Sequence, residues 1–198
     1  MALTSYQEDH CHEIIHTHAA ISGGANLVPI PGLGATADIG AMVSMGVALH
    51  KFFQEDIEYE TKKVIEELKH KIRSNAEGDS AAITGITMGL GISGVGFLVG
   101  ENIAESVIKE LAIQAIKSVA SKSVAKELIK FVPIIGQIVA PAISVALIEA
   151  AGWTLANSLH NLVYKNAISH LIEYCKNEDV PPYIREKIKS RLDERFNG

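Results

Sequence analysis

A turn containing proline and glycine occurs twice in the chain, and it restricts the fold more than any other feature. The turn Val28-Pro29-Ile30-Pro31-Gly32 recurs as Val132-Pro133-Ile134-Ile135-Gly136. In each copy proline fixes φ and removes a backbone N–H, and glycine lets the chain change direction. An apolar run rich in alanine, serine and glycine follows each turn, at residues 35–49 and 140–147. The repeat predicts two buried, closely packed helices.

Three stretches of the chain contain no formally charged residue, at positions 19–37, 80–100 and 131–148. They contribute to a positive mean hydropathy of +0.18 in a chain with few aromatic residues. The last two approach the ~18–20 apolar residues of a membrane-spanning helix, although polar residues and a proline dilute them. Three alternatives stay open for these stretches: the core of a helical bundle, helices that associate reversibly with a membrane, and spanning hairpins.

Glycine is unusually frequent in the second uncharged stretch. Gly85 and Gly89 are four residues apart, and so are Gly96 and Gly100. This spacing puts small residues on one face of a helix, where a neighbouring helix can approach closely. Such contact must offset the roughly 1 kcal/mol of helix propensity that each glycine loses relative to alanine. The pattern therefore predicts a glycine-rich central pair of apolar helices.

Helical periodicity runs through the rest of the chain, and no alternating strand pattern of useful length appears. The expected helices cover about residues 4–21, 37–53, 56–75, 101–120, 124–131 and 183–196, and a long helical stretch is expected to follow the second turn, through Ala142 to about Tyr174. We expect the first helix to stop at Ser22-Gly23-Gly24 and to turn Cys11, Ile14, Ile15 and Ala19 inward.

The second and last long helices carry further expectations. Thr36 is expected to cap the second helix, with Asp38 in its first turn. That helix is apolar nearly all round, which predicts a central position. Gly152 is a candidate kink in the long helix after the second turn. The fold class is all-α: a single-domain bundle of about six to eight helices over residues 1–198, with a core in 22–160 and a charged C-terminal helix in 181–198.

The composition argues against binding to nucleic acid and favours a reducing compartment. The net charge is -5 with acidic and basic residues interspersed, so no basic surface for nucleic acid is predicted. Cys11 and Cys175 are far apart and lack metal-type spacing, which favours a reducing compartment. The first ten residues lack the positive and apolar regions of a secretory signal. We expect a cytoplasmic protein, peripheral to a membrane if it binds one.

The stretch His12-Glu13-Ile14-Ile15-His16 matches the zinc-peptidase pattern, in which two histidines one helical turn apart bind zinc and the glutamate is the general base. The longer metzincin pattern would need glycine at Ala19 and histidine at Ser22. A third ligand would have to be Asp38, His18 or a distant residue. Three interpretations stay open: a zinc hydrolase using Glu13, metal binding by His10, His12, His16 and His18 without catalysis, and a solvated histidine face, which is favoured.

The two turns with the residues that follow them, 28–40 and 131–140, resemble the helical region after the GTPase domain in immunity-related (interferon-inducible) GTPases. They also resemble the uncharacterised helical domain attached to some bacterial GTPases and inner-membrane proteins. The resemblance covers about two thirds of the chain, from the first helix to about Leu159. It implies a helical module associated with membranes or with a GTPase partner. Because this chain has no G domain, the resemblance implies neither GTP hydrolysis nor any catalytic residue.

The sequence therefore predicts a non-enzymatic interaction module without a cofactor. Its partners would be a membrane lipid surface, a GTPase or other protein, or a second copy of the chain. The alternatives are the zinc hydrolase and a pore-forming toxin or effector with a buried apolar hairpin. The residues expected to shape turns and packing are Pro29, Pro31, Gly32, Asp38, Gly85, Gly89, Gly96, Gly100, Pro133 and Gly136.

Overall fold

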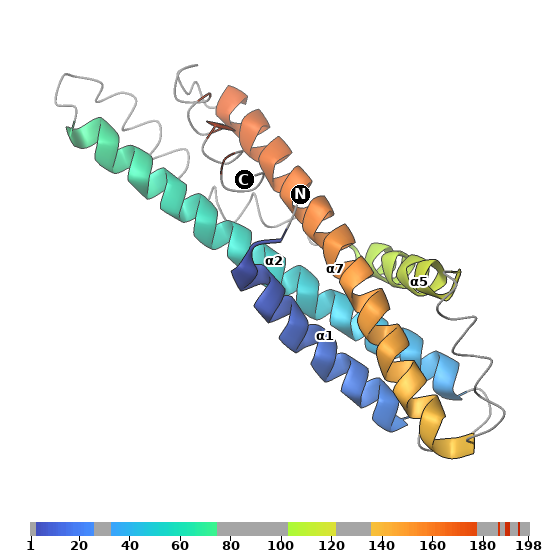
Figure 1. The fold of residues 1–198 in the computed structure, drawn as a ribbon. Helices are drawn as coiled ribbons and strands as arrows, with labels where there is room; N and C mark the ends of the chain where they lie inside the picture. The colour runs from blue at the N-terminus through green and yellow to red at the C-terminus, as the bar shows by residue number, and fades with distance from the viewer. Residues whose placement is uncertain are drawn as a thin grey trace. The chain divides into compact units, whose positions relative to one another are not determined.

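The computed structural model of the chain describes residues 3–25, 33–74, 103–121 and 136–177, together with 186, 189, 190 and 194 near the C-terminus. Within these residues the structure is all-helical and contains no strand (Figure 1). The helices are α1 (Ser5–Ala25), α2 (Leu33–Ser74), α5 (Glu105–Ser121) and α7 (Gly136–Asn177). The all-α class is confirmed. Four helices are described, so the count of six to eight and the glycine-rich pair stay predictions.

Helix α1 begins with a reciprocal cap. The backbone N–H of Thr4 donates to Oε1 of Gln7 at 2.9 Å, and the N–H of Gln7 donates to Oγ1 of Thr4 at 3.3 Å. This capping box satisfies two of the donors that a helix start leaves unpaired. The predicted start is confirmed, but the predicted stop is wrong because the helix continues to Ala25. Ser22 is buried, so packing of this last turn opposes the propensity cost of the two glycines that follow it.

Helix α2 is a single helix of 42 residues where the sequence predicted two. No glycine or proline lies between Phe53 and Asp56, so nothing in the backbone chemistry ends the first predicted helix before the second begins. The helix starts at Leu33, which makes the predicted cap at Thr36 wrong. Asp38 accordingly lies beyond the first turn of the helix.

Helices α5 and α7 agree closely with the prediction. The expected helix over 101–120 is observed as Glu105–Ser121, and the long helical stretch expected after the second turn, to about Tyr174, is observed as Gly136–Asn177. Gly136 of the second predicted turn is the first residue of α7. On α5 the buried positions are Ile108, Ala112 and Ala115, which form one of the two apolar rows expected from the sequence.

The chain divides into two compact units. Unit 2 comprises Ala2–Lys51 and Ile103–His160, and among described residues it holds α1, α5 and the first parts of α2 and α7. Unit 1 takes in the later parts of α2 and α7, from Phe52 and from Asn161 onward. The two long helices thus each supply residues to both units.

The core of unit 2 is built from all four helices. On α1 the buried residues include Cys11, Ile15 and Ala19, as predicted, whereas Ile14 is only half-buried. The other three helices contribute Met42, Met45, Leu49, Ile108, Ala112, Ala115, Ile148, Ala151, Leu155, Ala156 and Leu159. Side chains of four helices therefore share one apolar interior.

Two glycines lie where the helices of unit 2 approach most closely. A Cβ added to Gly152 would lie 2.8 Å from Cγ2 of Ile15 and 2.9 Å from Sδ of Met45. A Cβ added to Gly46 would lie 2.5 Å from Cγ2 of Ile108 and 3.3 Å from Cδ2 of Leu155. Within this unit α2 and α7 run in the same direction (Figure 1).

The second predicted helix is not buried all round, contrary to expectation. Ile39 is 37% exposed and Val47 is 46% exposed, while Met42, Met45 and Leu49 are buried. The first part of α2 therefore has one buried face and one exposed apolar face. Hydropathy alone does not separate these faces because both are apolar.

Unit 1 contains a buried tyrosine that bonds to a carboxylate. Tyr164 of α7 is fully buried, and its hydroxyl donates to Oδ2 of Asp56 on α2. Phe53 and Ile57 of α2 are buried in the same unit. This hydrogen bond satisfies a polar atom that would be costly to bury alone.

Several predicted features lie outside the described residues. They are Pro29, Pro31, Gly32, Gly85, Gly89, Gly96, Gly100 and Pro133. The uncharged stretch 80–100 lies there too. None of the helices, as far as they are described, combines the length and hydropathy needed to cross a membrane.

Candidate functional site

Four side chains form two cross-helix pairs between α1 and α7 in unit 2. His16 pairs with Glu149, and His12 pairs with Trp153. Each helix contributes residues spaced by four, which places both members on one helix face. The residue numbers rise on α1 as they fall on α7, so these two helices are antiparallel here. We call His12, His16, Glu149 and Trp153 the histidine ladder.

The first rung of the histidine ladder is polar. Nδ1 of His16 lies 2.8 Å from Oε1 of Glu149. Because a carboxylate only accepts, the hydrogen lies on Nδ1, and in the neutral ring the lone pair is left on Nε2. The two side chains are 64% and 38% exposed. Glu149 therefore sets the tautomer of a histidine that stays in contact with solvent.

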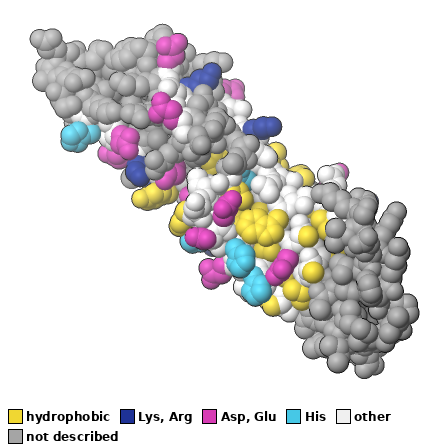
Figure 2. All heavy atoms as spheres, viewed as in Figure 1, with side chains coloured by type: hydrophobic (Ala, Val, Ile, Leu, Met, Phe, Trp, Pro, Cys, Tyr) yellow, Lys and Arg dark blue, Asp and Glu magenta, His cyan; other side chains and the backbone are white. Residues whose placement is uncertain are grey.

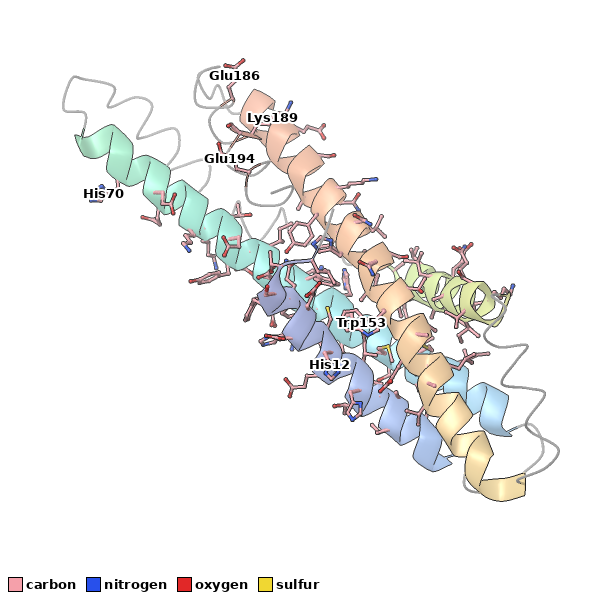
Figure 3. All side chains as sticks on the ribbon, in the orientation of Figure 1. His12, His70, Trp153, Glu186, Lys189 and Glu194 are labelled. Atoms are coloured by element: carbon pink, nitrogen blue, oxygen red, sulfur yellow. The ribbon has the colours of Figure 1, made fainter. Side chains whose placement is uncertain are left out.

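The second rung is aromatic. The rings of His12 and Trp153 have centroids 6.5 Å apart and are tilted by 46° (Figure 3). The rings of His12 and His16 are nearly parallel, at 6°, with centroids 5.9 Å apart. The face shown in Figure 2 carries histidine side chains beside hydrophobic and acidic ones. His12 and His16 are both exposed, so two imidazoles one helical turn apart lie on an accessible surface.

The other candidate ligands of α1 face different groups. Nδ1 of His18 donates to the carbonyl oxygen of Ile14 at 2.8 Å, and its Nε2 accepts from the hydroxyl of Ser44 at 3.3 Å. His10 directs Nδ1 to the carbonyl of Tyr6 at 3.3 Å. Glu13 is exposed. The structure therefore brings together His12 and His16 and engages both nitrogens of His18 elsewhere.

The zinc ligands predicted from the sequence can be compared with the observed positions of these side chains. Among the described residues, no group of three His, Cys, Asp or Glu side chains is arranged to hold a metal ion. The side chain of Asp38, one of the suggested third ligands, is outside the described set. A zinc hydrolase therefore stays a hypothesis, in which His12 and His16 would be two of the zinc ligands and Glu13 the general base.

A buried histidine in unit 2 was not singled out from the sequence. His50 of α2 is 6% exposed, and Nε2 has no hydrogen-bond partner within the part of the chain that the structure describes. Burial lowers the pKa of His50 from its ordinary value because the charged imidazolium loses hydration. Burial thus favours the neutral form of His50.

The charge of unit 2 is distributed unevenly. Lys51 is the first Lys or Arg in the chain, and none occurs between Lys130 and Lys165. The histidines are therefore the only side chains that can become cationic on α1 and on the parts of α2 and α7 before these lysines. Helix α1 and the residues of α2 before Lys51 therefore lack the fixed cations that draw basic helices to anionic lipid.

An apolar stripe lies on the exposed side of α2. Ile39, Val43 and Val47 follow one another at intervals of four residues and so share a helix face over about 12 Å. Ile39 and Val47 are exposed and Val43 is partly exposed. We call these three residues the α2 stripe. Continuous exposed apolar surface is a mark of interaction sites, whereas single exposed apolar residues are ordinary.

Comparisons of the chain with protein-family models, with curated proteins and with solved structures found no match. The resemblance to GTPase-associated helical regions therefore stays a prediction.

Sequence reasoning identified half of the histidine ladder. His12 and His16 were recognised from their spacing, but Glu149 and Trp153 were not. These two are also four residues apart, on a helix that was predicted correctly. Nothing in their spacing says which helix they face, so only the packing of α7 against α1 reveals the pairs.

Proposed function

We propose that the chain is a non-enzymatic helical interaction module that binds a partner protein through the α2 stripe. The row of Ile39, Val43 and Val47, in which Ile39 and Val47 are exposed and Val43 is partly exposed, is the observation that carries this proposal. Helical partners commonly bind through apolar anchors at intervals of three, four and seven or eight residues. The stripe offers such spacing on a rigid helix.

A protein partner is favoured over a membrane surface by the charge distribution. Stable attachment of an amphipathic helix to a bilayer usually combines apolar burial with Lys or Arg near the headgroups. The chain has neither Lys nor Arg before Lys51, so the α2 stripe has no such flanking charge on its N-terminal side. A GTPase is one class of partner, implied by the resemblance described above.

Site-specific photo-crosslinking in cells of the source organism tests the proposal. A photoreactive amino acid at Val47 should give one discrete crosslinked product, whereas the same group at exposed Ala20 of α1 should not. Val43→Glu should abolish the product at Val47, and Ala20→Glu should not. Identical products at both positions, or no product at Val47, would contradict the proposal. A product of twice the chain mass would identify a second copy as the partner.

Liposome flotation separates the membrane alternative from the protein partner. The proposal predicts that purified protein does not float with neutral or anionic vesicles. Flotation that Val47→Glu abolishes would instead assign the α2 stripe to a lipid surface. The pore-forming alternative depends on residues 80–100, which lie outside the described residues, and dye leakage from the same vesicles would support it.

The zinc-hydrolase alternative has a separate test. Metal analysis of tag-free protein should find stoichiometric zinc if His12, Glu13 and His16 form a catalytic centre. Hydrolase activity lost in Glu13→Gln but with zinc retained would support catalysis. An interaction module requires neither result.

A further inference from the structure

In the histidine ladder, His16 is already oriented to coordinate a metal ion. We infer that His12 and His16 form a binding site for a divalent transition-metal ion such as Zn²⁺ or Cu²⁺, with Glu149 as the residue that orients His16. This site is distinct from the proposed partner surface on α2. It requires no catalytic glutamate and no third protein ligand.

The contact with Glu149 prepares His16 for a metal. Metal-binding histidines commonly donate their second ring N–H to a carboxylate, which fixes the tautomer and makes the other nitrogen more basic. Nδ1 of His16 makes such a contact with Oε1 of Glu149 at 2.8 Å. The Nε2 lone pair is therefore the available donor, on a side chain that is 64% exposed.

His12 supplies the second donor from the same helix face. Its ring is 5.9 Å from that of His16, one helical turn away. An imidazole lone pair lies in the ring plane, so two nearly parallel rings must rotate to converge on one ion. His12 is exposed and makes no hydrogen bond within the described part of the chain, so its rotation breaks no such bond there.

The chemistry of the two donors selects the class of ion. Imidazole nitrogen suits Zn²⁺, Cu²⁺ and Ni²⁺, whereas Mg²⁺ and Ca²⁺ prefer oxygen. Of the first-row divalent ions, Cu²⁺ should bind tightest, as such sites generally follow the Irving–Williams order. With two protein ligands, water fills the remaining positions.

The chain contains a built-in reporter for this site. Trp153 is the only tryptophan, and its ring lies 6.5 Å from that of His12. Cu²⁺ bound at His12 is paramagnetic and close enough to quench the fluorescence of Trp153. Zn²⁺ is not paramagnetic, so it should compete with Cu²⁺ and restore the signal.

Fluorescence titration of the full chain with Cu²⁺ tests the inference. We expect saturable quenching with one ion per chain, reversed by a large molar excess of Zn²⁺ because Zn²⁺ binds more weakly than Cu²⁺. His12→Ala and His16→Ala should each weaken binding at least tenfold, and Glu149→Ala should weaken it about 10-fold or more. The controls His10→Ala, His18→Ala and Glu13→Gln should bind as the wild type does. Circular dichroism verifies that each variant keeps its helices.

Two results would overturn the inference. One is linear quenching equal to that of free N-acetyltryptophanamide, which indicates collisions in solution. The other is saturable quenching that survives in the folded His12→Ala/His16→Ala double variant, which places the ion elsewhere. Either result leaves the crosslinking test of the α2 stripe unaffected.

Discussion

His16 and Glu149 are 133 residues apart in the chain, yet Nδ1 of one lies 2.8 Å from Oε1 of the other. Both side chains reach solvent, with exposed fractions of 64% and 38%. Surface pairs of this kind contribute about 0–1 kcal/mol because water competes for both partners. The contact therefore orients His16 more than it stabilises the fold.

This exposure leads to the first prediction. We expect Glu149→Ala to lower the free energy of unfolding by less than about 1 kcal/mol in urea denaturation followed by circular dichroism. A double-mutant cycle with His16→Ala should give a coupling energy in the same range. A loss several times larger would show that the pair contributes to the core of unit 2.

The glycine at the contact of α2 with α5 and α7 gives the second prediction. A Cβ on Gly46 would lie 2.5 Å from Cγ2 of Ile108, a methyl group held close to the backbone. We expect Gly46→Ala to destabilise the protein by about 1–2 kcal/mol, because overpacking exceeds the gain in helix propensity. Thermal and urea denaturation measure the change.

Two variants make this prediction specific. Gly40→Ala on the same helix has nothing within 4 Å of the added Cβ, so it should stabilise the protein by about 0.5–1 kcal/mol. Ile108→Leu moves the branch methyl away from the contact and should recover part of the loss in the double variant. Equal effects of Gly46→Ala and Gly40→Ala would contradict the observed packing.

The capping box of α1 gives the third prediction. Thr4→Ala removes the oxygen that accepts from the N–H of Gln7 and should cost about 1 kcal/mol. Thr4→Ser keeps that oxygen and should be nearly neutral. Amide hydrogen exchange should show faster exchange in the first turn of Thr4→Ala alone. Unchanged protection there would mean that another group caps the helix.

The buried tyrosine of unit 1 gives the fourth prediction. Tyr164→Phe removes the hydroxyl that donates to Asp56 and leaves the carboxylate without that donor. We expect a loss of about 1.5–3 kcal/mol in the free energy of unfolding, the range for a hydrogen bond to a charged group. Tyr59 of α2 is 64% exposed, so Tyr59→Phe should change stability by less than about 0.5 kcal/mol. Similar effects of the two changes would contradict the burial of Tyr164.

The pH dependence of stability gives the fifth prediction. Burial lowers the pKa of His50 in the folded protein, so below its unfolded pKa of about 6.5 the unfolded chain binds more protons. The stability due to neutral His50 is therefore present above about pH 6.5 and is lost as the pH falls toward the folded pKa. His50→Gln does not titrate, and its stability should fall less on acidification than that of the wild type. Urea denaturation between about pH 8 and pH 5 measures the difference, and parallel curves would contradict the prediction.

Local patterns predicted the helices and part of their buried faces. The spacing of Cys11, Ile15 and Ala19 predicts the inward face of α1, and the long helical stretch expected after the second turn, to about Tyr174, is observed as α7. Helix ends were less predictable. Glycines after Ser22 suggested a stop, yet α1 continues to Ala25 because local propensity is weak compared with packing.

Local sequence patterns suffice to predict the all-α class found in the described part of the chain, since apolar periodicity and capping chemistry act within a few residues of one another. It also placed His12 and His16 on one face of α1, because helix geometry alone sets that spacing. The packing of the helices is needed to show that His16 meets Glu149, that Ile108 packs against Gly46, and that Ile39 and Val47 face solvent. These relationships depend on how one helix lies against another, and helix packing admits several angles and registers for the same apolar pattern.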